Sequence, residues 1–310
     1  MIDVETDVVI SDLTGSFSRL WESAEQACEG LHLTRSLTQN LILVTTPEQS
    51  SLSQELIGDL LDRHPCRAIV VIIHTNPCPL KATLSGLIRN HRKTRTLVLE
   101  KLVLETDWGH FRKLPNLIRP LLVSDIATSL FWAAELPDDP RTLSAIASLG
   151  DHTIVDSTLF GNGDWQRLEQ IHDHSPLDLA WLRVSPWRRT LAEAFEHFEW
   201  DPKKCDTQIT LEHGPGFGSH SASRCLAGWL TKRLQANVQL QRRQGGGPDG
   251  EPWLLDLKHG PIHVQIRHLK SEPRLQTIIT LQDHCLLPTY TQITGSGRPQ
   301  LLASAIDLAW

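Results

Sequence analysis

Hydrophobic residues along the chain fall into helical and strand-like patterns that alternate. Between Leu13 and Leu31 they recur every three or four positions, which is the spacing of one face of an amphipathic helix. Short apolar runs at 41–44 and 68–73 are too brief for helices and rich in branched side chains, as buried strands are. A second helical pattern, at 52–64, lies between the two runs and ends at Pro65. The chain is therefore predicted to begin with a helix, a strand, a helix and a strand.

The alternation resumes after a pair of neighbouring strands. Two strand patterns, at 82–88 and 96–104, flank a basic turn at 91–95 and are expected to extend the sheet in the antiparallel direction. The elements expected after them are a helix at 114–122, a strand at 126–133, a helix at 141–149, a strand at 153–155 and a helix at 163–172. We therefore predict, for residues 1–176, an α/β N-terminal domain with a mixed sheet covered by helices.

The polar segment 172–176 is the expected junction with a region in which the order of elements changes. The elements expected after it are a helix from Ser185 to Phe198, a strand at 208–211, a helix at 222–234, strands at 238–241, 253–257, 262–267 and 276–281, and a final helix at 301–310. Four strands without helices between them are typical of an antiparallel meander. We therefore predict that residues 177–310 form a smaller α+β domain with an antiparallel meander.

The composition is that of an ordinary folded protein, with 40% hydrophobic and 21% charged residues. A net charge of -6 offers no clustered Lys and Arg to attract nucleic acid or anionic lipid, so we expect neither as a partner. Arg67 and Lys81 bracket the best apolar stretch, which is too short to span a membrane. The acidic start differs from a secretory signal, and the six cysteines form no C-x-x-C pair. We therefore expect a cytoplasmic protein.

No arrangement of residues indicates a metal or catalytic site. The histidine pairs His172 with His174 and His259 with His263 lack the further ligands that zinc or iron sites require, so we expect no metal. Asp156 and Ser157 follow a predicted strand at its carboxyl end, but no G-x-S-x-G motif surrounds the serine. Capping of the next turn is the interpretation we favour for this pair. We expect the protein to be no enzyme and to hold no cofactor.

A glycine-rich loop is the best candidate for a ligand site. It contains Gly214, Gly216, Gly218 and Ser219, between a predicted strand and a predicted helix whose first N–H groups could receive a phosphate. The spacing is G-x-G-x-G, whereas a dinucleotide-binding turn has G-x-G-x-x-G. We favour a simple turn, and keep as the alternative a nucleotide- or sugar-phosphate-binding enzyme or sensor, with Arg242–Arg243 as phosphate partners.

Tryptophan is unusually frequent, with ten residues against one tyrosine. Most are expected in the core, because a tryptophan left in water exposes on the order of 150–250 Å². A few stand beside arginines near the expected domain junction, notably Trp181 with Arg183 and Trp187 with Arg188. Tryptophan and arginine are enriched at the centres of protein interfaces. This pattern therefore indicates a protein partner.

Several segments together carry a resemblance to one family. They are Arg35 with 40–42, the run 64–69, the run 120–125, Phe131–Trp132 with Leu136–Pro137, Asp151 with 154–157, Trp181–Leu182–Arg183 and Trp187–Arg188. In this order and spacing the chain resembles the glucose-6-phosphate dehydrogenase assembly proteins, the OpcA family. The likeness runs from about Arg35 to Phe198 and more loosely through the helix at 226–234. Two positions depart from the family pattern: Phe131 stands where a tryptophan is common, and Ala127 where a proline is common.

The resemblance implies a non-catalytic protein that binds glucose-6-phosphate dehydrogenase. As an assembly factor and allosteric activator it would promote the active oligomer of that enzyme in the oxidative pentose phosphate pathway. The residues expected at the partner surface are Trp132, Asp156, Ser157, Trp181, Arg183, Trp187 and Arg188. The phosphate-binding alternative at the glycine-rich loop stays open.

Overall fold

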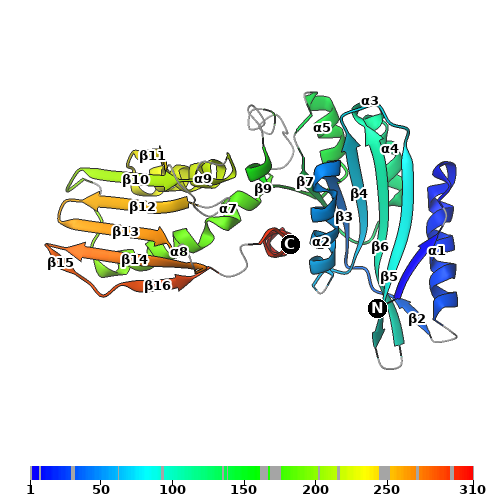
Figure 1. Ribbon diagram of the computed structural model, residues 1–310, viewed down its shortest axis with the longest axis horizontal. Coiled ribbons are helices and arrows are strands. Elements are labelled where there is room, and N and C mark those ends of the chain that lie inside the picture. Colours follow the sequence, from blue (N-terminus) through cyan, green and yellow to red (C-terminus); the bar gives the residue numbers. More distant parts are fainter. Residues whose placement is uncertain are drawn as a thin grey trace. The chain divides into compact units, whose positions relative to one another are not determined.

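A computed structural model describes residues 2–6, 8–28, 32–61, 63–91, 94–134, 136–137, 139–160, 167, 176–201, 203–214, 217–243, 252–269, 272–293 and 297–309 (Figure 1). The chain divides into two compact units. Unit 1 comprises Met1–Val155, Gly161–Leu177 and Arg298–Trp310, and unit 2 comprises Asp156–Phe160 and Asp178–Gly297. The expected junction at 172–176 and the expected helix at 163–172 lie almost wholly outside the described residues.

Unit 1 is built on a mixed sheet, as predicted. The strand order is β1-β5-β6-β4-β3-β7-β8-β9, with β2 paired to β6. The strands are β1 (Ile2–Thr6), β2 (Leu33–Arg35), β3 (Gln39–Thr45), β4 (Cys66–His74), β5 (Lys81–His91), β6 (Thr94–Asp107), β7 (Thr128–Ala133), β8 (His152–Val155) and β9 (Leu177–Asp178). Strands β6, β4, β3, β7 and β8 are parallel, and β5 and β1 extend the sheet antiparallel. The apolar runs in β3 and β4 form the buried centre.

Helices cover the sheet of unit 1. Helix α1 (Leu13–Ala27) packs on β1 and β5, α2 (Ser50–Leu60) packs on β3 and β4, and Figure 1 shows these helices on opposite sides of the sheet. Asp12 caps α1 by accepting a 2.9 Å hydrogen bond from the Gly15 N–H. The shorter helices are α3 (Trp108–Phe111), α4 (Leu114–Ile118) and α5 (Pro140–Ala147), with the 3-10 turns η1 (Ile10–Asp12), η2 (Pro47–Gln49) and η3 (Arg119–Leu121).

The last helix belongs to unit 1. Sequence order assigned it to the second domain, but α10 (Arg298–Leu308) packs against α2 instead. Asp307 on α10 forms ion pairs with Arg63 and, at 3.2 Å, with His64, just after α2. The sequence alone gives no sign of this return, because the return depends on which surface the apolar face of α10 covers.

Unit 2 has a second sheet with the order β11-β10-β12-β13-β14-β15, and β16 pairs with β14. Its elements are η4 (Ser157–Leu159), α7 (Leu179–Arg183), α8 (Ser185–Ala194), η5 (Phe195–His197), β10 (Thr207–His213), α9 (Phe217–Leu234), β11 (Val238–Arg242), β12 (Pro252–His259), β13 (Ile262–His268), β14 (Arg274–Leu281), β15 (His284–Cys285) and β16 (Thr289–Gln292). Strands β12, β13 and β14 form the predicted antiparallel meander. The α+β class is therefore confirmed.

The first of the four meander strands was placed wrongly. Strand β11 pairs in parallel with β10, and β12, the first meander strand, pairs with the other edge of β10. Helix α9 lies between β10 and β11 in the chain and packs on both. A strand joined to its neighbour by a helix returns parallel, since the helix brings the chain back to the starting edge. The core of unit 2 lies between this sheet and helices α7, α8 and α9.

Candidate functional site

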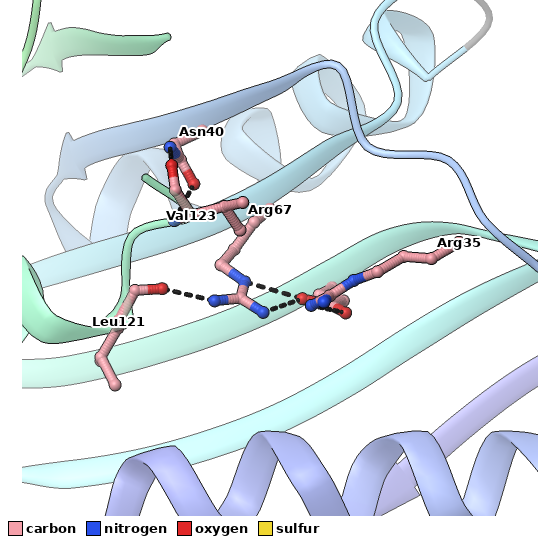
Figure 2. Close-up of polar contacts among 6 residues, drawn as sticks. Arg35, Asn40, Arg67, Leu121 and Val123 are labelled. Carbon is pink, nitrogen blue, oxygen red and sulfur yellow. Dashed lines mark hydrogen bonds and ion pairs between the residues drawn. The ribbon is translucent and has the colours of Figure 1, made fainter. Parts of the chain in front are cut away.

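A buried network of charged residues joins three strands of unit 1. Arg67 on β4 and Glu100 on β6 are register partners. Arg35 ends the short strand β2, which pairs with β6 along the same edge as β4, because β5 occupies the other edge. Arg67 Nε donates to Glu100 Oε2 at 2.7 Å, its Nη2 lies 2.6 Å from the same oxygen, and Nη1 donates to the Leu121 carbonyl (Figure 2). Arg35 forms an ion pair with the second oxygen, Oε1. One carboxylate thus serves two guanidinium groups.

The environment of Arg67 differs from that of Arg35. Arg67 is only 8% exposed, and its guanidinium carbon lies 4.2 Å from the centre of the Phe17 ring. Burial lowers the pKa of Arg67, while Glu100 opposes this, and an arginine with so high an ordinary pKa stays charged. The Arg35 side chain is 41% exposed. Arg67 is therefore a fixed part of the interior, whereas Arg35 reaches solvent.

Asn40 fixes the neighbouring loop to the same end of the sheet. Its Nδ2 donates to the Val123 carbonyl at 2.9 Å, and its Oδ1 accepts from the Val123 N–H at 3.0 Å (Figure 2). Nδ2 also contacts Thr128 Oγ1 on β7 at 3.2 Å. Arg35, Asn40, Arg67 and the loop come from separate segments that carried the sequence resemblance. The sequence assigned them no role, and Glu100 was missed, because the pairing depends on strand register.

A cavity of about 390 Å³ opens beside this network. Helix α1 forms one wall with Phe17 and Trp21, and Pro120 and Leu121 of η3 form another. Thr14 and Ser18 of α1 also line it, as do Arg35, Arg67 and Glu100. The cavity lies toward the amino ends of β3 and β4, since Asn40 and Arg67 are each the second residue of a strand. It combines charge with aromatic surface, as small-molecule sites do.

The carboxyl end of the same sheet is the usual ligand edge of an open α/β sheet. From β3 the chain adds β4 and β6 on one side and then β7 and β8 on the other, so the order of strands reverses between β3 and β7. Dinucleotides bind at such a switch point in open α/β sheets. The turn after β3 is Thr46 followed by η2, with Pro47 where glycines would cradle a phosphate. Asp107, at the end of β6, accepts hydrogen bonds from the N–H groups of Cys78 and His110, and the first of these bonds is the largest cause lowering its pKa.

In unit 2 the predicted residues Asp156, Ser157 and Arg183 lie together around Asp178. Ser157 Oγ donates to Asp178 Oδ2 at 2.6 Å, and the Ser157 N–H donates to Oδ1 at 3.0 Å. Burial raises the pKa of Asp178, against these hydrogen bonds. Asp156 accepts from the Thr158 N–H at 3.1 Å, so the predicted capping is confirmed, and its carboxylate lies 3.7 Å from Arg183 Nη2. The cluster fixes η4 and the start of α7 in place.

The predicted tryptophans divide into buried and half-buried ones. Trp132 on β7 of unit 1 is 1% exposed, and the centre of its ring lies 5.9 Å from that of Phe111, in an edge-on arrangement. Trp187 is 0% exposed in the core of unit 2. Trp181 is half-buried, and the Arg188 guanidinium stacks on it with its carbon 3.4 Å from the ring centre. In this conformation a partner can reach Trp181 and Arg188, but not Trp132 or Trp187.

The glycine-rich loop is described only in part. Gly216 lies outside the described residues, and of Gly218 and Ser219 only their place in the first turn of α9 is described. The Gly214 carbonyl oxygen lies 2.7 Å from His213 Nδ1, within hydrogen-bond distance, and His213 Nε2 lies 3.3 Å from His220 Nδ1. Burial, followed by the charge of His213, lowers the pKa of His220. The loop therefore sits at the carboxyl end of β10, within a parallel strand–helix–strand unit that the sequence analysis did not expect.

The predicted phosphate partners differ in their engagement. Arg243 lies 3.1 Å from Glu212 and 4.9 Å from the centre of the Trp253 ring, so its charge is already paired. Arg242 ends β11 and is exposed. Across the described ranges, no three His, Cys, Asp or Glu side chains gather as a metal site would require. The helices that the structure describes include none with the length and apolar character needed to cross a membrane.

The family models and the relatives that match this chain point to one family. Residues 58–172 match the family model for a glucose-6-phosphate dehydrogenase subunit N-terminal domain, and residues 175–304 match the model for the C-terminal domain of that subunit. A protein of Synechocystis named OxPP cycle protein OpcA is 25% identical over 230 residues, which cover 69% of this chain and 46% of that protein. Its namesake from Nostoc punctiforme is 24% identical over 212 residues, covering 64% and 44%. The chain thus spans less than half the length of these relatives.

Among solved structures, an oxidoreductase from Sinorhizobium meliloti aligns with a TM-score of 0.47 and 11% identity over 87% of each chain. A levoglucosan dehydrogenase in complex with NADH and L-sorbose aligns with a TM-score of 0.46 and 10% identity, over 87% of this chain and 88% of that one. Likeness at this level supports no conclusion on function.

Proposed function

Because the chain belongs to the OpcA family of glucose-6-phosphate dehydrogenase subunits, we propose that it binds glucose-6-phosphate dehydrogenase and promotes its active oligomer in the cytoplasm. The observation that carries the proposal is that the N-terminal and C-terminal family models match in order along one chain, at 58–172 and 175–304. The two relatives are named for the OxPP cycle, which supports a role in the oxidative pentose phosphate pathway.

We propose that the protein binds the dehydrogenase and catalyses no reaction of its own. Pro47 and Glu48 occupy the turn where a dinucleotide-binding sheet has its glycines, although the strand order would suit a dinucleotide. The Ser157 hydroxyl donates a hydrogen bond to the buried Asp178 carboxylate, which also accepts hydrogen bonds from the backbone N–H groups of Ser157 and Ala180. These hydrogen bonds hold the local structure in place. These observations support a binding protein, because a nucleophile needs a base that is free to take its proton.

The partner surface is proposed to centre on Trp181 and Arg188 of unit 2. Their stacked, half-buried side chains offer a flat group that loses little conformational freedom on binding, which favours a role as an anchor. Arg183 follows on α7, and Asp156 holds it from inside. Ser157, Trp132 and Trp187 contribute by stabilising their units, since they are buried.

Activation would follow from unequal affinity for two states of the dehydrogenase. A partner that binds the competent oligomer more tightly shifts the population toward it. A tenfold difference corresponds to about 1.4 kcal/mol of coupling. An anchor such as the Trp181–Arg188 pair would supply coupling of this size if only one of the two states made the contact, because interface hot spots contribute about 2 kcal/mol or more.

The test uses the dehydrogenase from the same cell. We expect the two proteins to elute together in gel filtration and the enzyme to show a higher kcat/KM when this protein is added. Trp181→Ala with Arg188→Ala should weaken the complex about tenfold or more. Arg189→Ala, an exposed neighbour on α8, is the matched control. Separate elution together with unchanged kinetics would refute the proposal.

One observation favours the alternative function, a phosphate-binding enzyme or sensor. The Gly214 loop lies between β10 and α9, and β11 returns parallel to β10, as in phosphate-binding strand–helix–strand units. Ligands of this site would raise the unfolding temperature, since they bind only the folded protein. NADP, NAD, ATP and sugar phosphates should each be screened. A shift that Arg242→Gln removes would support the alternative, and no shift with any of them would reject it.

A further inference from the structure

The cavity beside α1 is lined by two arginines, one buried and one exposed, and by one buried carboxylate. Arg35 and Arg67 share the single carboxylate of Glu100, whose side chain is 3% exposed. One guanidinium charge is therefore not balanced within this group. Glu22 also lines the cavity; it is exposed on α1, as Arg35 is on β2, so water and salt screen both charges in part.

Arg67 is held within the protein interior. Its Nε and Nη2 contact Glu100, its Nη1 donates to the Leu121 carbonyl, and Phe17 covers one face. Arg35 is different. Among the described residues its one ion-pair partner is Glu100, reached through Nη2. A guanidinium carries five N–H donors in a planar fork, so most donors of Arg35 remain available to a second anion.

The rest of the cavity suits the organic part of a small ligand. Its volume of about 390 Å³ lies within the range of small-molecule sites, roughly 300–1,000 Å³. Trp21 and Pro120 supply apolar wall, and Thr14 and Ser18 supply hydroxyl groups. Among the described residues, the site combines an arginine that keeps donors available, two hydroxyl-bearing residues and an aromatic wall, which is complementary to a ring that carries an oxyanion.

We propose that this cavity binds a small organic oxyanion, a phosphate monoester or a carboxylate attached to a ring, held by Arg35 and packed against Trp21. Bound there, the anion neutralises the unbalanced guanidinium charge. The site is separate from the proposed partner surface and from the Gly214 loop, because all its residues belong to unit 1. It would give the protein a means of sensing a metabolite.

The experiment is isothermal titration of the full chain with phenyl phosphate, benzoate, glucose 6-phosphate and the neutral control benzyl alcohol. We expect saturable binding of at least one anion, none of benzyl alcohol, and a Kd about tenfold or more higher in Arg35→Gln. Comparing phenyl phosphate with benzoate distinguishes the two oxyanion classes. Arg19→Gln is the matched control, an arginine of α1 with a 40% exposed side chain that does not line the cavity.

Two results would overturn the inference. One is that none of the three anions binds the unaltered protein. The other is that an anion binds equally well to Arg35→Gln and Arg19→Gln, which would place the anion outside this cavity. If Arg242→Gln then lost that binding, the anion would be assigned to the Gly214 loop. No dehydrogenase is present in these titrations, so their outcome does not depend on the proposed assembly function.

Discussion

Replacing Glu100 by Gln tests whether the buried charge network stabilises unit 1. The substitution keeps the size and one acceptor oxygen but leaves the Arg67 guanidinium, 8% exposed, without a counter-charge. Removing one partner of a buried ion pair costs about 3–5 kcal/mol. Because Arg35 can turn its charge toward water and the amide oxygen still accepts, we expect about 3 kcal/mol.

The assay is chemical and thermal denaturation of the full chain. For a unit of this size, about 3 kcal/mol corresponds to a fall in Tm of roughly 6–12 °C for the transition of unit 1. The control is Glu105→Gln on the same strand, whose carboxylate pairs with His74 at 3.0 Å and is 39% exposed. Exposed pairs contribute about 0–1 kcal/mol, so the control should differ little from the unaltered protein.

A second substitution separates charge from packing. Combining Glu100→Leu with Arg67→Met removes both charges and fills the space with apolar atoms, which is often neutral or stabilising for a buried pair. We expect this double variant to be more stable than Glu100→Gln. If Glu100→Gln unfolds like the Glu105→Gln control, the network does not stabilise unit 1 and the reasoning fails.

Three further predictions concern unit 2. Folding raises the pKa of Asp178, so the folded protein should lose stability as pH rises from about 3.9, the ordinary aspartate value, toward the higher pKa of the folded state. In a plot of Tm against pH, this decrease should be absent in Asp178→Asn. Burial, then Asp178, raises the pKa of Cys225 to about 12, so mass spectrometry should find exposed Cys285 alkylated by iodoacetamide well before Cys225. Trp187→Ala should cost about 3–5 kcal/mol in urea denaturation, against about 1 kcal/mol for half-buried Trp181→Ala; equal losses would contradict the assigned burial.

Local sequence predicted the elements well and their partners less well. The runs at 41–44 and 68–73 became β3 and β4, because an uninterrupted apolar run is stable only when both faces are covered. Strand β11 and helix α10 were recognised as elements but placed wrongly. The position of β11 follows from the crossover helix α9, which comes directly before it in the chain. The position of α10 depends on the surface of α2, which is far away in the chain.

The candidate site illustrates the same limit for side chains. Arg67 and Glu100 are 33 positions apart and meet only because β4 and β6 pair in one register. A shift by one residue would turn Glu100 to the other face of the sheet. The frequency of tryptophan pointed to a partner, yet Trp132 and Trp187 are used in packing. Of the tryptophans predicted at the partner surface, this leaves Trp181, half-buried and stacked with Arg188.

The two ends of the sheet in unit 1 bear on function in different ways. Its parallel strand order is one that dinucleotide-binding proteins use, so the order alone would favour a cofactor at the carboxyl ends of β3 and β7. The residues at that end argue against this, since η2 begins with Pro47 and Asp107 is occupied by backbone N–H groups. The charged cavity lies at the amino ends instead, around Arg35 and Arg67. The charged residues of unit 1 that bear on ligand binding therefore lie at the end of the sheet opposite the usual ligand edge.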